Sequence, residues 1–223
     1  MKGFAFDLEG TSVDLEDLHF EAYEHALADL GISMSAAEVA AIPGAIGGGM
    51  AVIFAALSKS YPTLTRTVLR EHKTKYFSAM LEKADLKPRV GLIDFVERLL
   101  ASGAPISIGS TTACSYGEAL IQRSGLAQYF KPESCFFRED VTSLKPAPEI
   151  YLRTATYMHI KPQEQIVFED SVPGIMAGKA AGSVVIAVPS PFALNEERIG
   201  MLRSAGARNL YPEWTLVPRE FAD

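Results

Sequence analysis

Acidic residues directly follow two apolar runs of this sequence, at positions where they could do chemistry. Asp7 and Glu9 come after the run at 3–6, and Glu169 and Asp170 come after the run at 165–168. Pairs of carboxylates suit a hard cation with oxygen ligands, and Mg²⁺ is the first candidate. The alternatives are a surface aspartate that closes a strand, for Asp7, and an ordinary turn, for the second pair.

Hydroxyl residues and a lysine complete this set of polar groups. Ser110 and Thr111 follow the apolar run at 104–109, and Lys145 opens the segment Lys-Pro-Ala-Pro. Hydroxyls and backbone N–H groups ahead of a helix N-terminus bind oxyanions such as phosphate, and a lysine supplies compensating positive charge. Helix capping is the alternative for the hydroxyls, and a solvated loop position is the alternative for Lys145.

The elements that must position these residues alternate between helix and strand after residue 88. We predict helices at 92–100, 115–124, 148–159, 172–181 and 195–205, and strands at 3–6, 104–109, 135–137, 165–168, 183–188 and near 208–210. Alternating units of this kind form a parallel sheet with helices on both faces, so the fold class is α/β. Ligands bind such sheets at the carboxyl ends of the strands, where these polar residues lie.

Residues 15–84 carry only helical patterns. We predict helices at 15–30, from the capping box at 35–38 onward, at 50–57 and at about 63–84, with a glycine-rich loop at 43–49. No strand pattern occurs among them. A helical insertion therefore interrupts one α/β domain, and the chain crosses between the two near 13–16 and 84–88.

Composition limits the partners of the protein. The 223 residues carry a net charge of -6, which argues against nucleic acid or an anionic membrane as a partner. Cys114 and Cys135 have no metal-binding spacing, so a cytoplasmic, reducing location without disulfides or zinc is expected. Asp7 and Glu9 interrupt any signal sequence, and prolyl and glycyl residues disrupt the uncharged stretch 39–58, so no membrane anchor is expected.

Four segments together resemble the motifs of the haloacid dehalogenase superfamily. They are Asp7-Leu-Glu9-Gly-Thr after a strand, Ser110 after a strand, Lys145-Pro-Ala-Pro, and Glu169-Asp170-Ser-Val-Pro-Gly174 after a strand. The resemblance extends from residue 2 to about 190 and is closest to the β-phosphoglucomutase-like phosphatase branch. It implies a Rossmann-like catalytic core at 1–14 and 85–223, and an inserted α-helical cap at 15–84.

The resemblance also implies a role for each motif residue. Asp7 would attack phosphorus and form an aspartyl-phosphate, and Glu9 would act as general acid and base. Ser110 and Thr111 would bind phosphate oxygens, and Lys145 would offset charge on Asp7 and the phosphoryl group. Mg²⁺ would be held by Asp7, the backbone carbonyl of Glu9, Asp170 and, directly or through water, Glu169.

Glu9 departs from the Asp-x-Asp pattern of the superfamily. The extra methylene moves the carboxyl group by roughly 1.5 Å if the backbone stays in place. A misplacement of about 1 Å can cost on the order of a hundredfold in rate. The enolase-phosphatase-like branch is similar to Asp-x-Glu-Gly-Thr here, so glutamate is compatible with catalysis.

In the cap, His19 is placed like a histidine of the mutase-like branch and is a candidate substrate contact; an exposed helix histidine is the alternative. The glycine loop at 43–49 lacks the arginine that a mutase would need for a second phosphate. It also lacks the Schiff-base lysine of phosphonoacetaldehyde hydrolase, which the segment at 108–112 otherwise resembles.

The resulting expectation is a Mg²⁺-dependent phosphatase that acts on a small phosphorylated metabolite, such as a sugar phosphate. A sugar phosphomutase and a non-catalytic phosphate-ligand binding protein are the alternatives, the latter because of Glu9. A monomer or weak dimer is expected.

Overall fold

The structure is a computed structural model that describes residues 2–192, 194–218 and 221. The chain divides into two compact units. Residues Leu15–Asp85 form one unit, and the segments Met1–Asp14 and Leu86–Asp223 together form the other.

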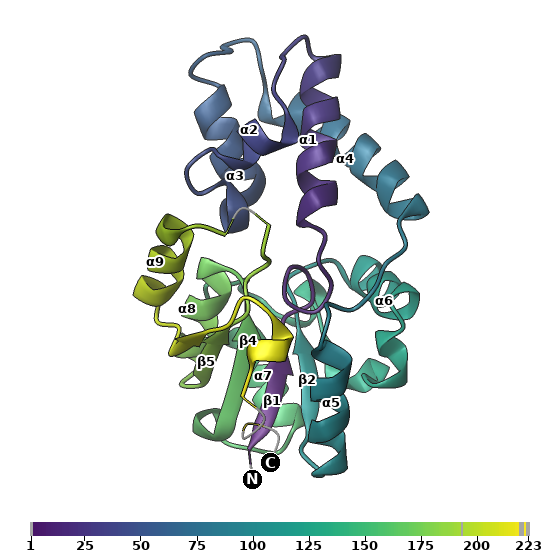
Figure 1. Cartoon of the computed structure of the whole chain (residues 1–223), viewed down its shortest axis with the longest axis vertical. Coiled ribbons are helices and arrows are strands. Elements are labelled where there is room, and N and C mark those ends of the chain that lie inside the picture. The colour runs from purple at the N-terminus through teal and green to yellow at the C-terminus, as the bar shows by residue number, and fades with distance from the viewer. Residues whose placement is uncertain (1, 193, 219–220, 222–223) are drawn as a thin grey trace. The chain divides into compact units, whose positions relative to one another are not determined.

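The larger unit is built on a parallel sheet of six strands. The strands are β1 (Gly3–Phe6), β2 (Ile106–Gly109), β3 (Cys135–Phe136), β4 (Gln165–Glu169), β5 (Val184–Ala187) and β6 (Asn209–Leu210). Their order is β3-β2-β1-β4-β5-β6, and every pairing is parallel. Figure 1 shows β1 in the middle, between β2 and β4. The predicted α/β class is thereby confirmed.

Both faces of the sheet are covered, which is why its central strand β1 is a continuous apolar run. Alternate side chains of β1 point to opposite faces. On one face Phe6 packs against Phe95 and Trp214, with ring centroids 6.5 and 5.6 Å away. On the other face Ala5 belongs to a buried cluster with Ile150.

Helices and short 3-10 turns connect the strands of this unit. The helices are α5 (Leu92–Ala101), α6 (Cys114–Arg123), α7 (Glu149–Tyr157), α8 (Val172–Ala180) and α9 (Glu196–Ala205); the 3-10 turns are η1 (Leu126–Gln128), η2 (Pro132–Ser134), η3 (Arg138–Asp140), η4 (Pro162–Glu164) and η5 (Trp214–Leu216). Phe95 lies on α5 and Ile150 on α7, so the two faces of the sheet carry different helices.

The smaller unit is helical throughout. It contains α1 (Glu16–Asp29), α2 (Ala36–Ala40), α3 (Ala45–Leu57) and α4 (Arg66–Lys83), and none of its residues lies in a strand. The predicted capping box is present, because Ser35 and Glu38 cap each other at the start of α2. Gly47 and Gly49 have positive φ inside α3 and break its regular geometry, so continuous helix begins only after Gly49.

The loop after β1 is held by contacts from distant parts of its own unit. The guanidinium of Arg89 donates to four carbonyl oxygens, including that of Gly10 at 2.9 Å. The indole of Trp214 donates to the carbonyl of Thr11, also at 2.9 Å. Gly10 has φ +80°, a conformation that a side chain would strain. The backbone that carries Asp7 and Glu9 is therefore fixed from several sides.

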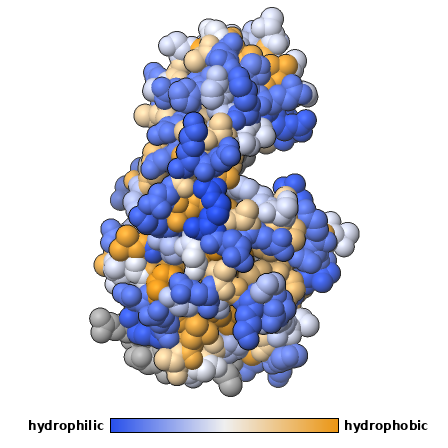
Figure 2. All heavy atoms as spheres, turned by 90° about the vertical axis from the view of Figure 1, so that its right-hand side faces the viewer, coloured by the Kyte–Doolittle hydropathy of each residue, from blue (hydrophilic) through white to orange (hydrophobic). Residues whose placement is uncertain are grey.

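On the face shown in Figure 2, hydrophilic side chains predominate and hydrophobic ones form small separate groups. Scattered apolar residues of this kind are ordinary on protein surfaces. Within the part of the chain that the structure describes, every helix is too short or too polar to span a bilayer.

Candidate active site

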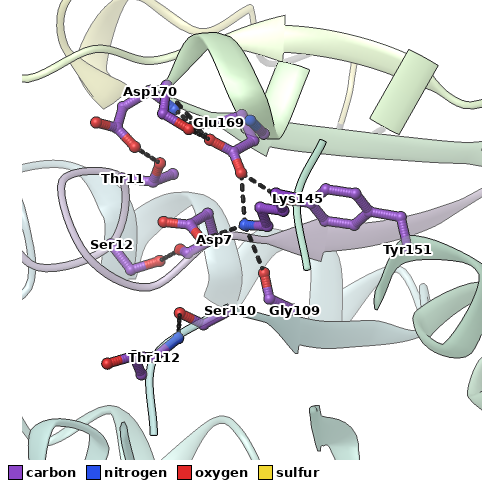
Figure 3. A network of polar contacts seen from close by, with 12 residues as sticks. Asp7, Thr11, Ser12, Gly109, Ser110, Thr112, Lys145, Tyr151, Glu169 and Asp170 are labelled. Atoms are coloured by element: carbon purple, nitrogen blue, oxygen red, sulfur yellow. Dashed lines mark hydrogen bonds and ion pairs between the residues drawn. The ribbon is translucent and has the colours of Figure 1, made fainter. Parts of the chain in front are cut away.

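The predicted polar residues gather at one edge of the sheet because the central strands end at the same level. Phe6 of β1 pairs with Ile108 of β2 and with Phe168 of β4. The next residues along the chain, Asp7 and Glu169, consequently lie side by side (Figure 3). Both are buried, with 7% and 0% of their surface exposed.

Lys145 joins these two carboxylates. Its Nζ donates to Oδ1 of Asp7 at 2.5 Å, to Oε1 of Glu169 at 2.6 Å and to the carbonyl of Gly109 at 3.0 Å. The lysine side chain is 6% exposed, so these three acceptors replace water around the ammonium group. Figure 3 shows the ammonium at the centre of this network.

Glu169 has hydrogen-bond donors on both carboxylate oxygens. In addition to Lys145, Oε1 accepts from the hydroxyl of Tyr151 at 2.7 Å. Oε2 accepts from the backbone N–H groups of Asp170 and Ser171 and from the Ser171 hydroxyl, at 3.0 to 3.1 Å. Gly174 makes room for this group, since a Cβ there would lie 1.8 Å from Oε1 of Glu169.

Three buried carboxylates form a group that could hold a metal ion. One oxygen each of Asp7, Glu169 and Asp170 lie within 4.8 Å of one another. The Thr11 hydroxyl donates to Asp170 at 3.1 Å, and the Arg198 guanidinium lies 3.6 Å from the same carboxylate. Buried oxygen ligands of this kind fit a hard divalent cation.

Burial dominates the electrostatics of Asp7. It raises the pKa of Asp7 from an ordinary 3.8 to about 7, against the opposing attraction of Lys145 and with further repulsion from Glu169 and Glu9. Burial by itself would lower the pKa of Lys145, but attraction to Asp7 and Glu169 raises it above its ordinary value. Lys145 therefore stays charged, whereas ionising Asp7 in the folded protein costs free energy.

The predicted phosphate-binding residues follow β2. Ser110 is buried, and its hydroxyl accepts from the backbone N–H of Thr112 at 3.3 Å. Thr111 is half-buried, and its carbonyl accepts from Arg138. Helix α6 begins at Cys114, so both hydroxyl residues lie just ahead of a helix N-terminus.

Glu9 contacts an aromatic hydroxyl that the sequence did not single out. Tyr116 donates to Oε2 of Glu9 at 3.5 Å, and both residues are half-buried. Burial and the charge of Glu9 raise the pKa of Tyr116 far above that of an ordinary tyrosine, so its hydroxyl keeps its proton. Ser12, also not predicted, donates to the carbonyl of Asp7 at 2.6 Å.

His19 lies in the helical unit and is half-buried, which differs from the exposed alternative. Its Nδ1 is 2.7 Å from Nζ of Lys73, and its ring stacks on Phe77 with centroids 4.2 Å apart. His19, Lys73 and Arg70 line a cavity of about 350 Å³ between α1, α3 and α4. Its role as a substrate contact stays a prediction.

Similarity to known proteins places the chain in a family. Residues 4–188 match the family model described as haloacid dehalogenase-like hydrolase. The chain is 29% identical to the fructose-1-phosphate phosphatase YqaB of Escherichia coli over 81% of its own length and 92% of that protein. It is 26% identical to protein CbbY of Rhodobacter capsulatus, over 88% and 89%.

A solved structure agrees with these matches. A conserved haloacid dehalogenase-like protein of unknown function from Agrobacterium tumefaciens superposes with a TM-score of 0.84 and 25% identity, over 100% of this chain and 98% of that one. By its family model, its relatives and its fold, the chain belongs to the haloacid dehalogenase-like hydrolases.

Proposed function

We propose that the protein is a Mg²⁺-dependent phosphatase that hydrolyses a small phosphorylated metabolite through an aspartyl-phosphate on Asp7. The observation that carries this proposal is the contact of Lys145 with both Asp7 and Glu169 at the end of the central strands. This contact joins two buried carboxylates to one ammonium group, and it supports the roles proposed for Asp7 as nucleophile and for Lys145 as its counter-charge. The resemblance of YqaB, named as a fructose-1-phosphate phosphatase, supports a sugar phosphate as substrate.

In the first step, an oxygen of Asp7 attacks phosphorus and the bond to the leaving oxygen breaks. Because Lys145 binds Oδ1, we assign the attack to Oδ2. Glu9 donates a proton to the leaving oxygen as this bond breaks. Ser110 and Thr111 bind the phosphoryl oxygens together with the N-terminus of α6.

In the second step, Glu9 takes a proton from a water molecule, which attacks phosphorus. The bond between phosphorus and Asp7 then breaks, which releases inorganic phosphate and restores the carboxylate. Splitting the reaction in this way replaces one difficult hydrolysis by two easier displacements. Lys145 offsets the negative charge of Asp7 and the phosphoryl group in both steps.

Asp7, Asp170 and the backbone carbonyl of Glu9 would hold Mg²⁺, which would screen the repulsion between carboxylate and phosphate. We give Glu169 a different role from direct coordination. Its oxygens already accept from Lys145, Tyr151 and the segment 170–171, so it orients the lysine and the strand end. A water-mediated contact with the cation is compatible with this role.

The cavity in the helical unit favours a second candidate, a sugar phosphomutase. The glycine loop lacks an arginine, but Arg70 and Lys73 supply two cationic side chains to the cavity. These cations could bind a second phosphate of a bisphosphorylated sugar. Movement of phosphate between two positions of one sugar, without release of inorganic phosphate, would identify the mutase.

A panel of phosphate esters, assayed for inorganic phosphate with Mg²⁺ present, tests the phosphatase. We expect turnover of at least one sugar phosphate, none by the Asp7→Asn variant, and a phosphorylated wild-type protein by mass spectrometry. Turnover retained by Asp7→Asn, or no turnover across the panel, would refute the proposal. Tight binding of a phosphate ester without a phosphorylated protein would indicate a non-catalytic binding protein instead.

Substitutions of Glu9 test its role in proton transfer. Glu9→Gln removes the ionisable group, whereas Glu9→Asp keeps it and moves it back by about one methylene. We therefore expect the glutamine variant to lose more turnover than the aspartate variant. Equal and negligible effects would remove the acid and base role.

A further inference from the structure

Tyr116 and Glu9 contact each other across the site from segments that follow two different strands. It lies in the first turn of α6, which follows β2, whereas Glu9 follows the neighbouring strand β1. Its hydroxyl donates to Oε2 of Glu9 at 3.5 Å, although 107 residues separate the two in sequence. This contact lies within the α/β unit and joins the loop of the proposed nucleophile to the helix that follows the proposed phosphate site.

The backbone around Glu9 is fixed, but its side chain has one more rotatable bond than an aspartate. Gly10 donates to the carbonyl of Val13 at 2.8 Å, and Arg89 donates to the carbonyl of Gly10. The position of the carboxyl group therefore depends on how the side-chain torsions are held. A long flexible side chain loses conformational entropy when it is confined to one rotamer, so a fixed geometry needs a compensating contact.

A tyrosine is well suited to supply that contact. Its ring has only two side-chain torsions, so it presents a hydroxyl at a defined place with little conformational freedom. The hydroxyl faces Oε2 of Glu9 at 3.5 Å, which is longer than the roughly 2.5–2.7 Å of a charge-assisted O–H···O⁻ bond, so the contact limits where the carboxylate can lie and does not bind it tightly. The Tyr116 side chain extends from a helix, which positions functional groups more rigidly than a loop does.

We infer that Tyr116 is a positioning residue that holds the extended carboxylate of Glu9 in place for proton transfer. This inference rests on the proposed function, in which Glu9 is the general acid and base. Tyr116 acts through Glu9 and makes no bond to phosphorus. The contact with Tyr116 accounts for a glutamate at position 9, because the tyrosine hydroxyl restricts the longer side chain.

The test compares Tyr116→Phe with the wild type at saturating Mg²⁺, on whichever phosphate ester the panel identifies. Phenylalanine keeps the ring and removes only the hydroxyl. We expect kcat to fall by about tenfold, which corresponds to about 1.4 kcal/mol, with KM changed less than about twofold. Since Glu9 serves both steps, single-turnover experiments should show slower formation and slower breakdown of the phosphorylated protein.

Tyr129→Phe is the matched control. The Tyr129 hydroxyl donates to Glu97 at 2.8 Å in an exposed pair of the same unit, away from the residues of the site. Like Tyr116→Phe, this variant loses a hydrogen bond from a tyrosine hydroxyl to a glutamate, but Tyr129 does not contact Glu9. We expect its kcat and KM to equal those of the wild type, and the thermal unfolding temperatures of both variants to stay close to the wild-type value.

A double-mutant cycle distinguishes support of Glu9 from other roles. In the Glu9→Gln background the acid and base are absent, so removing the Tyr116 hydroxyl should cost no further activity. The same tenfold loss in that background would overturn the inference, as would an unchanged kcat or an effect confined to KM. If the wild type hydrolyses no phosphate ester, the proposed function fails as well; wild-type turnover with an unaffected Tyr116→Phe overturns only the inference.

Discussion

Replacement of Asp7 by asparagine is expected to abolish turnover and to stabilise the fold in the absence of metal. Asp7 and Glu169 share the single ammonium of Lys145, at 2.5 and 2.6 Å. These three buried groups carry an excess of one negative charge when all are ionised. The neutral amide of the Asp7→Asn variant would remove that excess, while Lys145 keeps Glu169 as its partner. The Asp7→Asn variant should therefore be more stable to unfolding than the wild type, although it lacks the proposed nucleophile.

The pKa of Asp7 gives the magnitude and the sign of the expected stability difference between Asp7→Asn and the wild type. Its folded value of about 7 exceeds the ordinary value of 3.8, so the folded state binds more protons than the unfolded state between these values. Stability consequently falls as pH rises through this window. A difference of about three pKa units, at about 1.4 kcal/mol each, sets an upper limit of about 4 kcal/mol. The advantage of Asp7→Asn should be small near pH 4 and complete above pH 7.

Urea unfolding, followed by the fluorescence of the buried Trp214, measures this advantage. The series runs from pH 4 to 8.5 in a chelator, with wild type and Asp7→Asn compared at each pH. Asp94→Asn is the control, because it removes the same charge from a helix position of the same unit that lies outside the site. A difference between wild type and Asp7→Asn that does not grow with pH, or a less stable Asp7→Asn at pH 8, would refute the electrostatic reasoning.

Two further substitutions probe the same site. Lys145→Met leaves two buried carboxylates without their cation, so we expect a loss of about 3–5 kcal/mol in urea unfolding at pH 8, opposite in sign to Asp7→Asn; unchanged stability would contradict this account of the ion pair. In Gly10→Ala, the new Cβ would lie 2.4 Å from the Asp170 carboxylate at a φ of +80°, so Mg²⁺ affinity by calorimetry should fall by at least about tenfold. Gly31→Ala, with a φ of +75° and nothing within 4 Å, carries the backbone strain alone and should bind Mg²⁺ normally; equal affinities in the two variants would exclude the clash as the cause.

The fold class could be predicted from the sequence because burial on both faces leaves a simple signal. The strand Gly3–Phe6 is apolar at every position, and the strand Gln165–Glu169 is apolar at its three central positions, as expected of central parallel strands. The family was also identified correctly from the four motifs, three of which follow strands. The predictions of the fold class and of the family both depend on which residue types occur at which positions along the chain, and these can be read from the sequence.

Contacts across the site could not be predicted in the same way. The hydroxyl of Tyr151 reaches Glu169 because α7 turns that side of the helix toward β4, and the start of a helix is uncertain by one or two residues in a sequence. A shift of one residue rotates each side chain by about 100° around the helix axis. The same uncertainty hides the contact between Tyr116 and Glu9. Gly174, in contrast, carried a readable signal, since a glycine beside buried carboxylates indicates a close approach.

The cost of ionising Asp7 and the proposed use of a cation have a common origin in this site. Three carboxylates lie within 4.8 Å in a buried place, which is unfavourable unless positive charge accompanies them. Lys145 supplies part of that charge permanently, and a bound cation would supply the rest. A ligand present at a hundred times its dissociation constant stabilises the folded state by about 2.7 kcal/mol, which is comparable to the cost inferred for Asp7. A site whose own side chains balanced all of its charges would be more stable without metal. It would also have no excess negative charge with which to bind the cation, and it could not support a reaction that needs the cation.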